Sequence, residues 1–228
     1  MDRPVSIIGR ALVNLWDQMF NLVLCNVLWL AAHAGVVTAM GRVLFRWEMP
    51  WFLLLVLVVP GPPATAALFY VTNKVAHGRL ARVSDFWKGF KRYFLAGWKW
   101  GGLNLLVTLT LGYAVIFYGY GEIPAPYGFL LALVSLLLLG GWLLTQLFAF
   151  PFWLEQADQR IRPALQNALA FQAQNPLLTG IILVLVTTML GLTWLFPPLL
   201  GMVTAAFLAM VGNTAVVAEI KALQQPEE

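Results

Sequence analysis

Long apolar runs, each bounded by charged residues or by proline and glycine, dominate the chain. A helix needs about 20 apolar residues to cross the hydrocarbon core of a bilayer. Six stretches of the sequence have this character, so the pattern predicts an all-α polytopic membrane bundle that forms a single domain, 1–228. The predicted spans are 18–40, 51–71, 98–118, 127–153, 176–196 and 199–217.

The last two spans are separated only by Phe196, Pro197 and Pro198. The combined stretch of about 40 residues is too long for one crossing at about 1.5 Å of rise per residue. The paired prolines also remove two backbone donors from any continuous helix. The sequence therefore predicts a tight hairpin between two separate helices.

Composition agrees with a membrane protein, because 61% of the residues are hydrophobic and only 11% are charged. Soluble domains carry roughly a quarter of their residues as charged side chains, and the mean hydropathy is +0.79. The low charge density excludes a soluble domain as the class of protein. The net charge of +4 does not indicate a nucleic-acid partner, since in membrane proteins the placement of Lys and Arg matters more than their sum.

Basic residues concentrate in alternate loops of the predicted topology. The long segment 72–97 holds six of them, whereas only Arg42 and Arg46 fall in loops on the other side. Loops rich in Lys and Arg remain in the cytoplasm. The sequence thus predicts a multi-pass protein of the inner (plasma) membrane with both termini cytoplasmic.

The segment 85–97 has the pattern of an amphipathic helix that lies in the cytoplasmic interface, with Ser84 as its N-cap. Three interpretations are open: a docking face for a partner such as a transporter or sensor, a face for anionic lipid headgroups, and a plain topological anchor. Aromatic residues recur on one side of this predicted helix and basic residues on the other. The candidate docking or lipid-facing residues are Lys88, Phe90, Lys91, Arg92 and Phe94.

Two features within the spans could form a path for a solute. Several polar residues fall on one stripe of the first span, for which hydrogen bonding between helices is the alternative interpretation. In the second span, Pro62 and Pro63 predict a nonhelical break covered by the first helix, because exposed backbone is not tolerated in hydrocarbon. Broken helices also form substrate sites in many transporters.

Enzymatic chemistry has no support in the sequence. There is no glycine-rich phosphate loop and no set of nucleophile, base and acid. With His33 and His77 as the two histidines and Cys25 as the one cysteine, a metal site rich in these residues is excluded. We expect a protein that is not an enzyme and has no catalytic residues, cofactor-binding residues or metal.

Four segments of the first half resemble the YesL-like bacterial membrane proteins: 26–30 (NVLWL), 61–70 (GPPATAALFY), 73–74 (NK) and 85–91 (DFWKGFK). The resemblance extends roughly to Asn104. In that family the Gly-Pro-Ala-Thr element usually follows the first helix closely, whereas here 35–59 intervene. The resemblance implies an inner-membrane protein of bacteria that is linked by gene neighbourhood to carbohydrate uptake and degradation, and it confers no catalytic residues.

Two functions remain as hypotheses. The first is a transport-related protein, or an accessory to carbohydrate uptake, in which Trp29 or Trp142 provides a stacking face for a small sugar. The second is a noncatalytic adaptor or scaffold that docks a partner through the helix at 85–97. The expected partners are the lipid bilayer, a transporter or sensor, and a small sugar. The candidate solute path comprises Asn14, Asp17, Gln18, Asn21, Trp29, Pro62 and Trp142.

The predicted topology can be tested with reporter fusions or cysteine labelling at Gly121 and Gln225. We expect the two positions on opposite sides of the membrane, because Gly121 follows the third span and Gln225 follows the sixth. Membrane-impermeant labelling of intact and permeabilised cells distinguishes the two sides. Finding both positions on one side would contradict the six-span topology.

Overall fold

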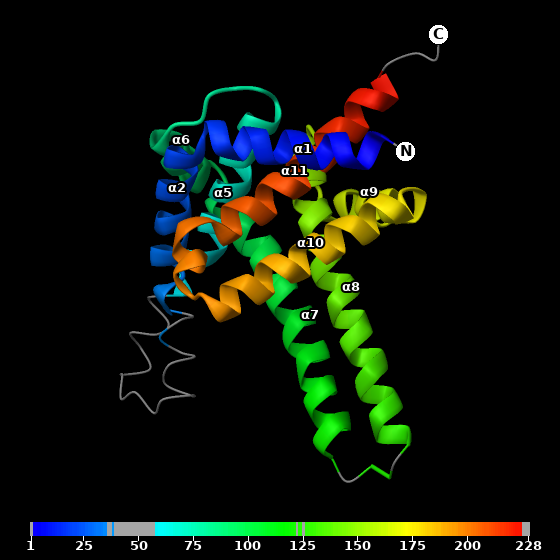
Figure 1. Ribbon diagram of the computed structural model, residues 1–228. Helices are drawn as coiled ribbons and strands as arrows, with labels where there is room; N and C mark the ends of the chain where they lie inside the picture. The colour runs from blue at the N-terminus through cyan, green and yellow to red at the C-terminus, as the bar shows by residue number, and fades with distance from the viewer. Residues whose placement is uncertain (1, 36–37, 39–57, 122, 125, 225–228) are drawn as a thin grey trace.

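The computed structural model describes residues 2–35, 38, 58–121, 123–124 and 126–224, and every regular element in these ranges is helical. The all-α fold class is therefore confirmed for the described part of the chain (Figure 1). Its elements are α1 (Asp2–Asp17), α2 (Met19–Ala32), α5 (Gly61–Ala76), α6 (Val83–Arg92), α7 (Phe94–Tyr120), α8 (Tyr127–Glu155), α9 (Ile161–Gln174), α10 (Pro176–Leu195), the π-helical turn η1 (Leu200–Thr204) and α11 (Ala205–Gln224).

Four of the described helices are long and apolar enough to cross a membrane: α7, α8, α10 and the continuous helix of η1 and α11. They correspond to the spans predicted at 98–118, 127–153, 176–196 and 199–217. A nonhelical turn at Phe196 and Pro197 separates α10 from the helix that follows it. The predicted division of this apolar stretch into two helices is thus confirmed.

The span predicted at 18–40 is not one continuous helix in the described residues. Helices α1 and α2 meet at Gln18 with a bend of 86°, and α2 has only 14 residues. The backbone N–H of Ala81 donates to Oε1 of Gln18 at 3.4 Å, which ties the bend to the loop before α6. If the bent pair forms one crossing, the described residues contain five candidate spans. Residues 36–37 and 39–40 of the predicted span lie outside the described residues.

The prediction that Pro62 and Pro63 are nonhelical is wrong, since both prolines lie in the first turn of α5. Proline suits that position because its fixed φ is helical and its missing N–H would have no partner there. The nonhelical residues are Val59 and Pro60. Residues 51–57, where the second span was predicted to begin, lie outside the described ranges, so six spans remain a prediction.

Helix α5 occupies the centre of the bundle and contacts α1, α2, α6, α7, α8 and α11. Its small residues allow this close approach, and Ala64, Ala66 and Ala67 are fully buried. Glycine completes the fit on α6, where a Cβ on Gly89 would lie 3.1 Å from Cα of Ala67. It does so again on α7, where a Cβ on Gly97 would lie 3.0 Å from Cα of Pro63.

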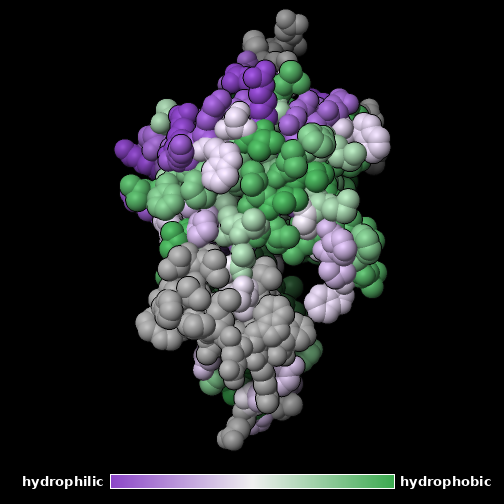
Figure 2. All heavy atoms as spheres, turned by 90° about the vertical axis from the view of Figure 1, so that its left-hand side faces the viewer, coloured by the Kyte–Doolittle hydropathy of each residue, from purple (hydrophilic) through white to green (hydrophobic). Residues whose placement is uncertain are grey.

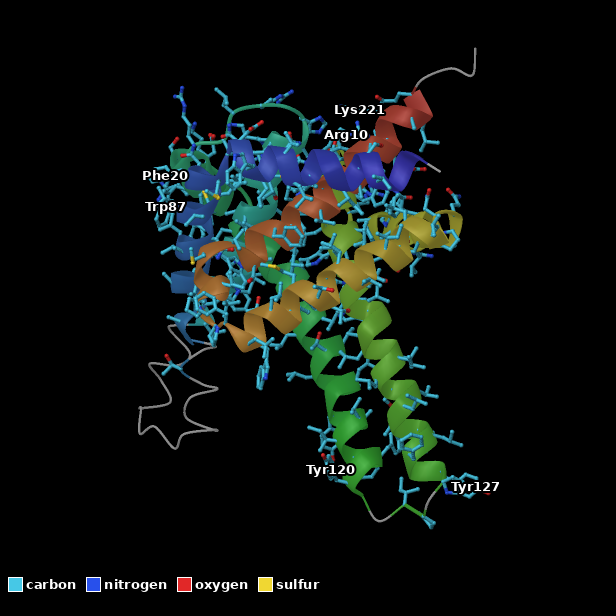
Figure 3. All side chains as sticks on the ribbon, in the orientation of Figure 1. Arg10, Phe20, Trp87, Tyr120, Tyr127 and Lys221 are labelled. Atoms are coloured by element: carbon cyan, nitrogen blue, oxygen red, sulfur yellow. The ribbon has the colours of Figure 1, made fainter. Side chains whose placement is uncertain are left out.

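The molecule has a hydrophilic end and an apolar body, as Figure 2 shows. Arg10 and Lys221 lie at the hydrophilic end, whereas Tyr120 and Tyr127 lie at the far tip of the hairpin that α7 and α8 form (Figure 3). The 27 residues of α7 span about 40 Å at about 1.5 Å per residue. This length exceeds the hydrocarbon core of about 30 Å, so α7 is long enough to cross a bilayer and extend beyond it.

Replacing Gly89 with alanine tests the contact between α5 and α6. The added methyl would lie 2.9 Å from Cδ1 of Tyr70 and 3.1 Å from the Ala67 backbone, and overpacking of this kind costs about 1–3 kcal/mol. We expect a lower thermal unfolding midpoint in detergent. The matched control is Gly102→Ala on α7, where a Cβ meets nothing within 4 Å and helix propensity improves by about 1 kcal/mol. Equal midpoints for the two variants would contradict the close contact.

Candidate functional site

The basic segment before α7 folds differently from the predicted helix at 85–97. Helix α6 begins at Val83 and ends at Arg92, and Phe94 is the first residue of α7. The N-cap is Arg82 rather than Ser84. The backbone N–H of Arg82 donates to Oδ2 of Asp85 at 3.1 Å, so the carboxylate in the first turn of α6 satisfies the N–H of the N-cap residue itself. A serine N-cap would instead have accepted a hydrogen bond from an N–H of the first turn.

The inner side of α6 packs on protein. Phe86 and Tyr93 are buried at 1% and 4% exposure, and the ring of Tyr93 lies 5.8 Å from that of Tyr70 on α5. Periodicity predicted an apolar side for this segment but could not identify what covers it. The small residues of α5 and the glycine at Gly89 let the two helices approach, and protein therefore takes the place that lipid was predicted to take.

The outer side of α6 exposes both charge and an aromatic ring. Lys88, Lys91 and Arg92 are exposed, and Trp87 is 49% exposed. Of the other two candidate docking residues, Phe90 and Phe94 are half-buried. Sequence reasoning missed Trp87, although a tryptophan next to a lysine at the edge of the apolar side was a usable signal. We name Trp87, Lys88, Lys91 and Arg92 the α6 face.

A buried carboxylate fixes α6 to α5. Oδ2 of Asp85 accepts a hydrogen bond from Nζ of Lys74 at 2.7 Å, and its Oδ1 accepts one from Nζ of Lys88 at 3.2 Å. Burial by itself raises the pKa of Asp85, but the hydrogen bonds from Lys74, Lys88 and Arg82 outweigh it and hold the pKa below its usual value of 3.8. The acidic residue of α6 is thus neutralised internally, and the α6 face keeps a net positive charge.

The polar stripe of the predicted first span is divided between two helices. Asn14 and Asp17 lie on α1, Asn21 lies on α2, and the 86° bend at Gln18 separates them. Asp17 is exposed, whereas Asn14, Gln18 and Asn21 are half-buried. The predicted stripe is therefore divided between two helix axes and does not run along one continuous helix.

The aromatic residues of the candidate path bind other protein groups. Nε1 of Trp29 donates to Oγ1 of Thr65 on α5 at 3.0 Å, and its ring lies 4.3 Å from that of His33. Nε1 of Trp142 donates to Oδ1 of Asn104 at 2.9 Å, joining α8 to α7. Their polar atoms are therefore used to connect helices.

Pro62, the remaining residue of the candidate path, packs against α7. A Cβ on Gly101 would lie 2.6 Å from Cβ of Pro62, so this glycine leaves space for the proline ring. Pro62 is half-buried in this contact. Its neighbour Gly61 faces α2 instead, where a Cβ would lie 3.3 Å from the ring of His33.

Asn26, a fully buried residue of the sequence motif NVLWL, has a structural role that sequence reasoning missed. Its Nδ2 donates to the carbonyl oxygens of Leu200 and Gly201, each at 2.7 Å, and its Oδ1 accepts from the N–H of Ala206 at 2.8 Å. These backbone groups belong to η1 and the start of α11. The wider π-helical turn changes the usual backbone pairing, and Asn26 satisfies the groups concerned.

A second buried asparagine, Asn213 on α11, begins a polar network that reaches the hydrophilic end. Its Nδ2 donates to Oγ1 of Thr72 at 2.9 Å, and its Oδ1 accepts from Nδ2 of Asn73 at 3.2 Å. Nδ2 of Asn73 also lies 2.7 Å from Oε1 of Glu155, and Nε2 of His77 lies 2.8 Å from the same oxygen. The network therefore joins α5, α8 and α11.

A surface hollow of about 380 Å³ lies beside this network. Glu155 belongs to both, and the hollow is lined by the ends of α8 and α11 and by α9. No residue of the candidate solute path lines it. Its walls combine carboxylates, amides and apolar groups, which are Glu155, Gln156, Asn167, Gln174, Glu219, Phe152, Ala170, Phe171, Ile220 and Leu223.

Comparison with known proteins identifies one relationship. Residues 22–118, somewhat less than half of the chain, match the model of a protein family of unknown function, DUF624. The YesL-like proteins that the sequence resembles are commonly assigned to DUF624. No curated protein and no solved structure matches the chain. The matched region contains α5, α6 and most of α2 and α7, and therefore Asn26, Asn73 and Asp85.

Replacing Asp85 with asparagine tests the carboxylate that holds α6. Because its pKa is lowered in the folded protein, its contribution to stability is present above the unfolded value near 3.8 and is lost as pH falls toward the folded value. We expect Asp85→Asn to lower the unfolding midpoint at pH 7 and to lower it less at pH 3. Asp158→Asn is the matched control, since that carboxylate is 55% exposed. A constant difference at both pH values would contradict this role.

Proposed function

We propose that the protein is a noncatalytic integral membrane adaptor, accessory to carbohydrate uptake, that docks a partner through the α6 face. The observation that carries this proposal is the exposure of an aromatic ring and three cations on a helix whose inner side is firmly anchored. Buried Phe86, buried Gly89 and the Lys74–Asp85 ion pair hold α6 against α5. A face that is ordered before binding costs less entropy when a partner associates.

The chemistry of the α6 face favours a protein partner with an acidic surface. Tryptophan and arginine are enriched among the residues that dominate interface energies, and Trp87 and Arg92 stand on this face. Arg92 is positioned over the ring of Tyr93, 5.4 Å from its centroid, which restricts the side chain before binding. Opposite charges across an interface increase the association rate and the specificity.

A role as adaptor agrees better with the candidate path residues than a role as channel or carrier does. A sugar path needs several donors and acceptors that converge on one cavity, which is how small-molecule sites achieve specificity. Here the Nε1 atoms of Trp29 and Trp142 bind Thr65 and Asn104. The polar stripe is divided by the bend at Gln18.

Carbohydrate uptake enters the proposal through the resemblance to the YesL-like proteins. That resemblance links the chain to uptake of carbohydrate, and it rests on the same segments that build α5 and α6. The partner we propose is therefore a transporter for carbohydrate, or a sensor associated with one. The same resemblance supports a place in the bacterial inner membrane, and the excess of Lys and Arg at the hydrophilic end supports a cytoplasmic location for that end.

Direct binding of a small sugar is a second candidate, and the hollow beside α9 favours it. Sugars bind where amide and carboxylate groups adjoin aromatic rings, and Gln156, Asn167 and Glu155 adjoin Phe152 and Phe171 there. Its place at the hydrophilic end suits a solute that arrives from water. Under this second proposal, the protein contributes to transport by binding the sugar itself.

Site-specific crosslinking tests the adaptor. A photoreactive amino acid at Trp87 should give one discrete protein adduct in cells, identified by mass spectrometry as a transporter or sensor of carbohydrate uptake. The triple variant Lys88→Gln, Lys91→Gln, Arg92→Gln should reduce the adduct roughly tenfold, as expected for the loss of about 1.4 kcal/mol. The matched control carries the photoreactive group at Tyr120, which is 90% exposed at the far tip of the hairpin.

Two outcomes would overturn the adaptor. One is an adduct with lipid alone at Trp87, and the other is the same protein adduct from Trp87 and Tyr120. The second candidate is tested by assaying the purified protein for saturable binding of radiolabelled mono- and disaccharides. Binding that is lost in Asn167→Leu would support the hollow, and binding that is unchanged in this variant would contradict it.

A further inference from the structure

Helix α1 has three distinct edges, of which the first faces the bundle. Ile7 and Ala11 are buried at 1% and 2% exposure, and α1 contacts α11 along this edge. Residues four apart lie on the same side of a helix. One side of α1 is therefore occupied by protein.

The second edge of α1 is apolar and exposed. Val5, Leu12 and Trp16 are 70%, 47% and 73% exposed. Leu12 and Trp16 follow Val5 by seven and eleven positions, and at about 100° per residue these spacings place all three on one side of the helix. This edge lies about 140° around the helix from the edge that faces the bundle. Phe20, 76% exposed, continues exposed apolar surface just past the bend.

The third edge of α1 is polar. Arg10 and Asp17 are exposed and lie on one side of the helix, about 120° from the apolar edge. One edge of this helix therefore suits contact with protein, one suits lipid and one suits water. These media meet only where a membrane protein passes through the interface between lipid and water.

The orientation of α1 agrees with such a location. It lies across the hydrophilic end of the molecule, at the level of Lys221 and away from the tip of the α7–α8 hairpin (Figures 1 and 3). Its axis is turned by 86° from α2, which descends from it toward the apolar body (Figure 1). A horizontal helix at this end would have the headgroup layer beside it.

We infer that α1 is an interfacial helix whose apolar edge inserts into the boundary between headgroups and acyl chains, with bilayer lipid as its occupant. Leu12 and Trp16 then contact acyl and glycerol groups of the lipid, whereas Arg10 and Asp17 remain hydrated. Tryptophan is well suited to this boundary because its ring is apolar and its N–H is polar. The chain enters the membrane at Gln18. This inference does not depend on the α6 face or its partner.

Spin-label accessibility along α1 tests the inference in the full-length protein, reconstituted in nanodiscs of phosphatidylethanolamine and phosphatidylglycerol. Single cysteines at Leu12, Arg10 and Asp17 carry the label in a Cys25→Ala background. If that background fails to fold, Cys25 is retained, since its buried side chain should not react. Collisions with oxygen, which concentrates in lipid, are compared with collisions with a water-soluble nickel chelate.

We expect the ratio of oxygen to nickel accessibility to be several-fold higher at Leu12 than at Asp17 and Arg10. A label at Leu12 as accessible to nickel as the label at Asp17 would place the helix in water and overturn the inference. Low accessibility of Leu12 to both reagents, with dipolar coupling between labels of two copies, would assign this edge to a second copy and overturn it as well.

Discussion

Close packing against α5 is the interaction on which the rest of this structure depends. Six described helices meet α5, and they can do so because it presents alanine where most membrane helices present leucine. In lipid there is little hydrophobic gain from bringing two apolar helices together, so association relies on van der Waals fit and on hydrogen bonds. Ala67 opposite Gly89 and Pro63 opposite Gly97 supply that fit, and α6 and α7 take their positions from it.

Buried amides then connect the two halves of the chain. Asn26 binds the backbone of η1, and Asn213 binds Thr72 and Asn73 of α5. Each of these polar groups would be costly if it were left unpaired at membrane depth, so each contact fixes the register between two helices. The match to DUF624 ends at residue 118, yet the matched helices depend on partners from the later half for these contacts.

Polar groups in the interior connect helices, whereas many at the hydrophilic end are exposed. Inside, Trp29 and Trp142 use their N–H groups to connect helices, and the network of Asn73 and Glu155 reaches outward to the hollow beside α9. At the hydrophilic end, α1 and α6 leave aromatic and basic side chains exposed. The proposed functions therefore belong to that end, where a partner, a solute and the lipid headgroups can all make contact.

The sequence by itself determined the helical class and the spans of α7, α8, α10 and α11, because each of these is a long apolar run with clear boundaries. It also indicated the exposed cations of α6, since charge patterning is local. Tertiary structure alone decided that Phe86 and Tyr93 face protein, that the stripe from Asn14 to Asn21 bends at Gln18, and that Asn26 and Asn213 bind distant helices. Periodicity specifies which side of a helix is apolar, but protein and lipid are equally apolar neighbours. Only contacts between residues far apart in the chain decide which of the two covers that side.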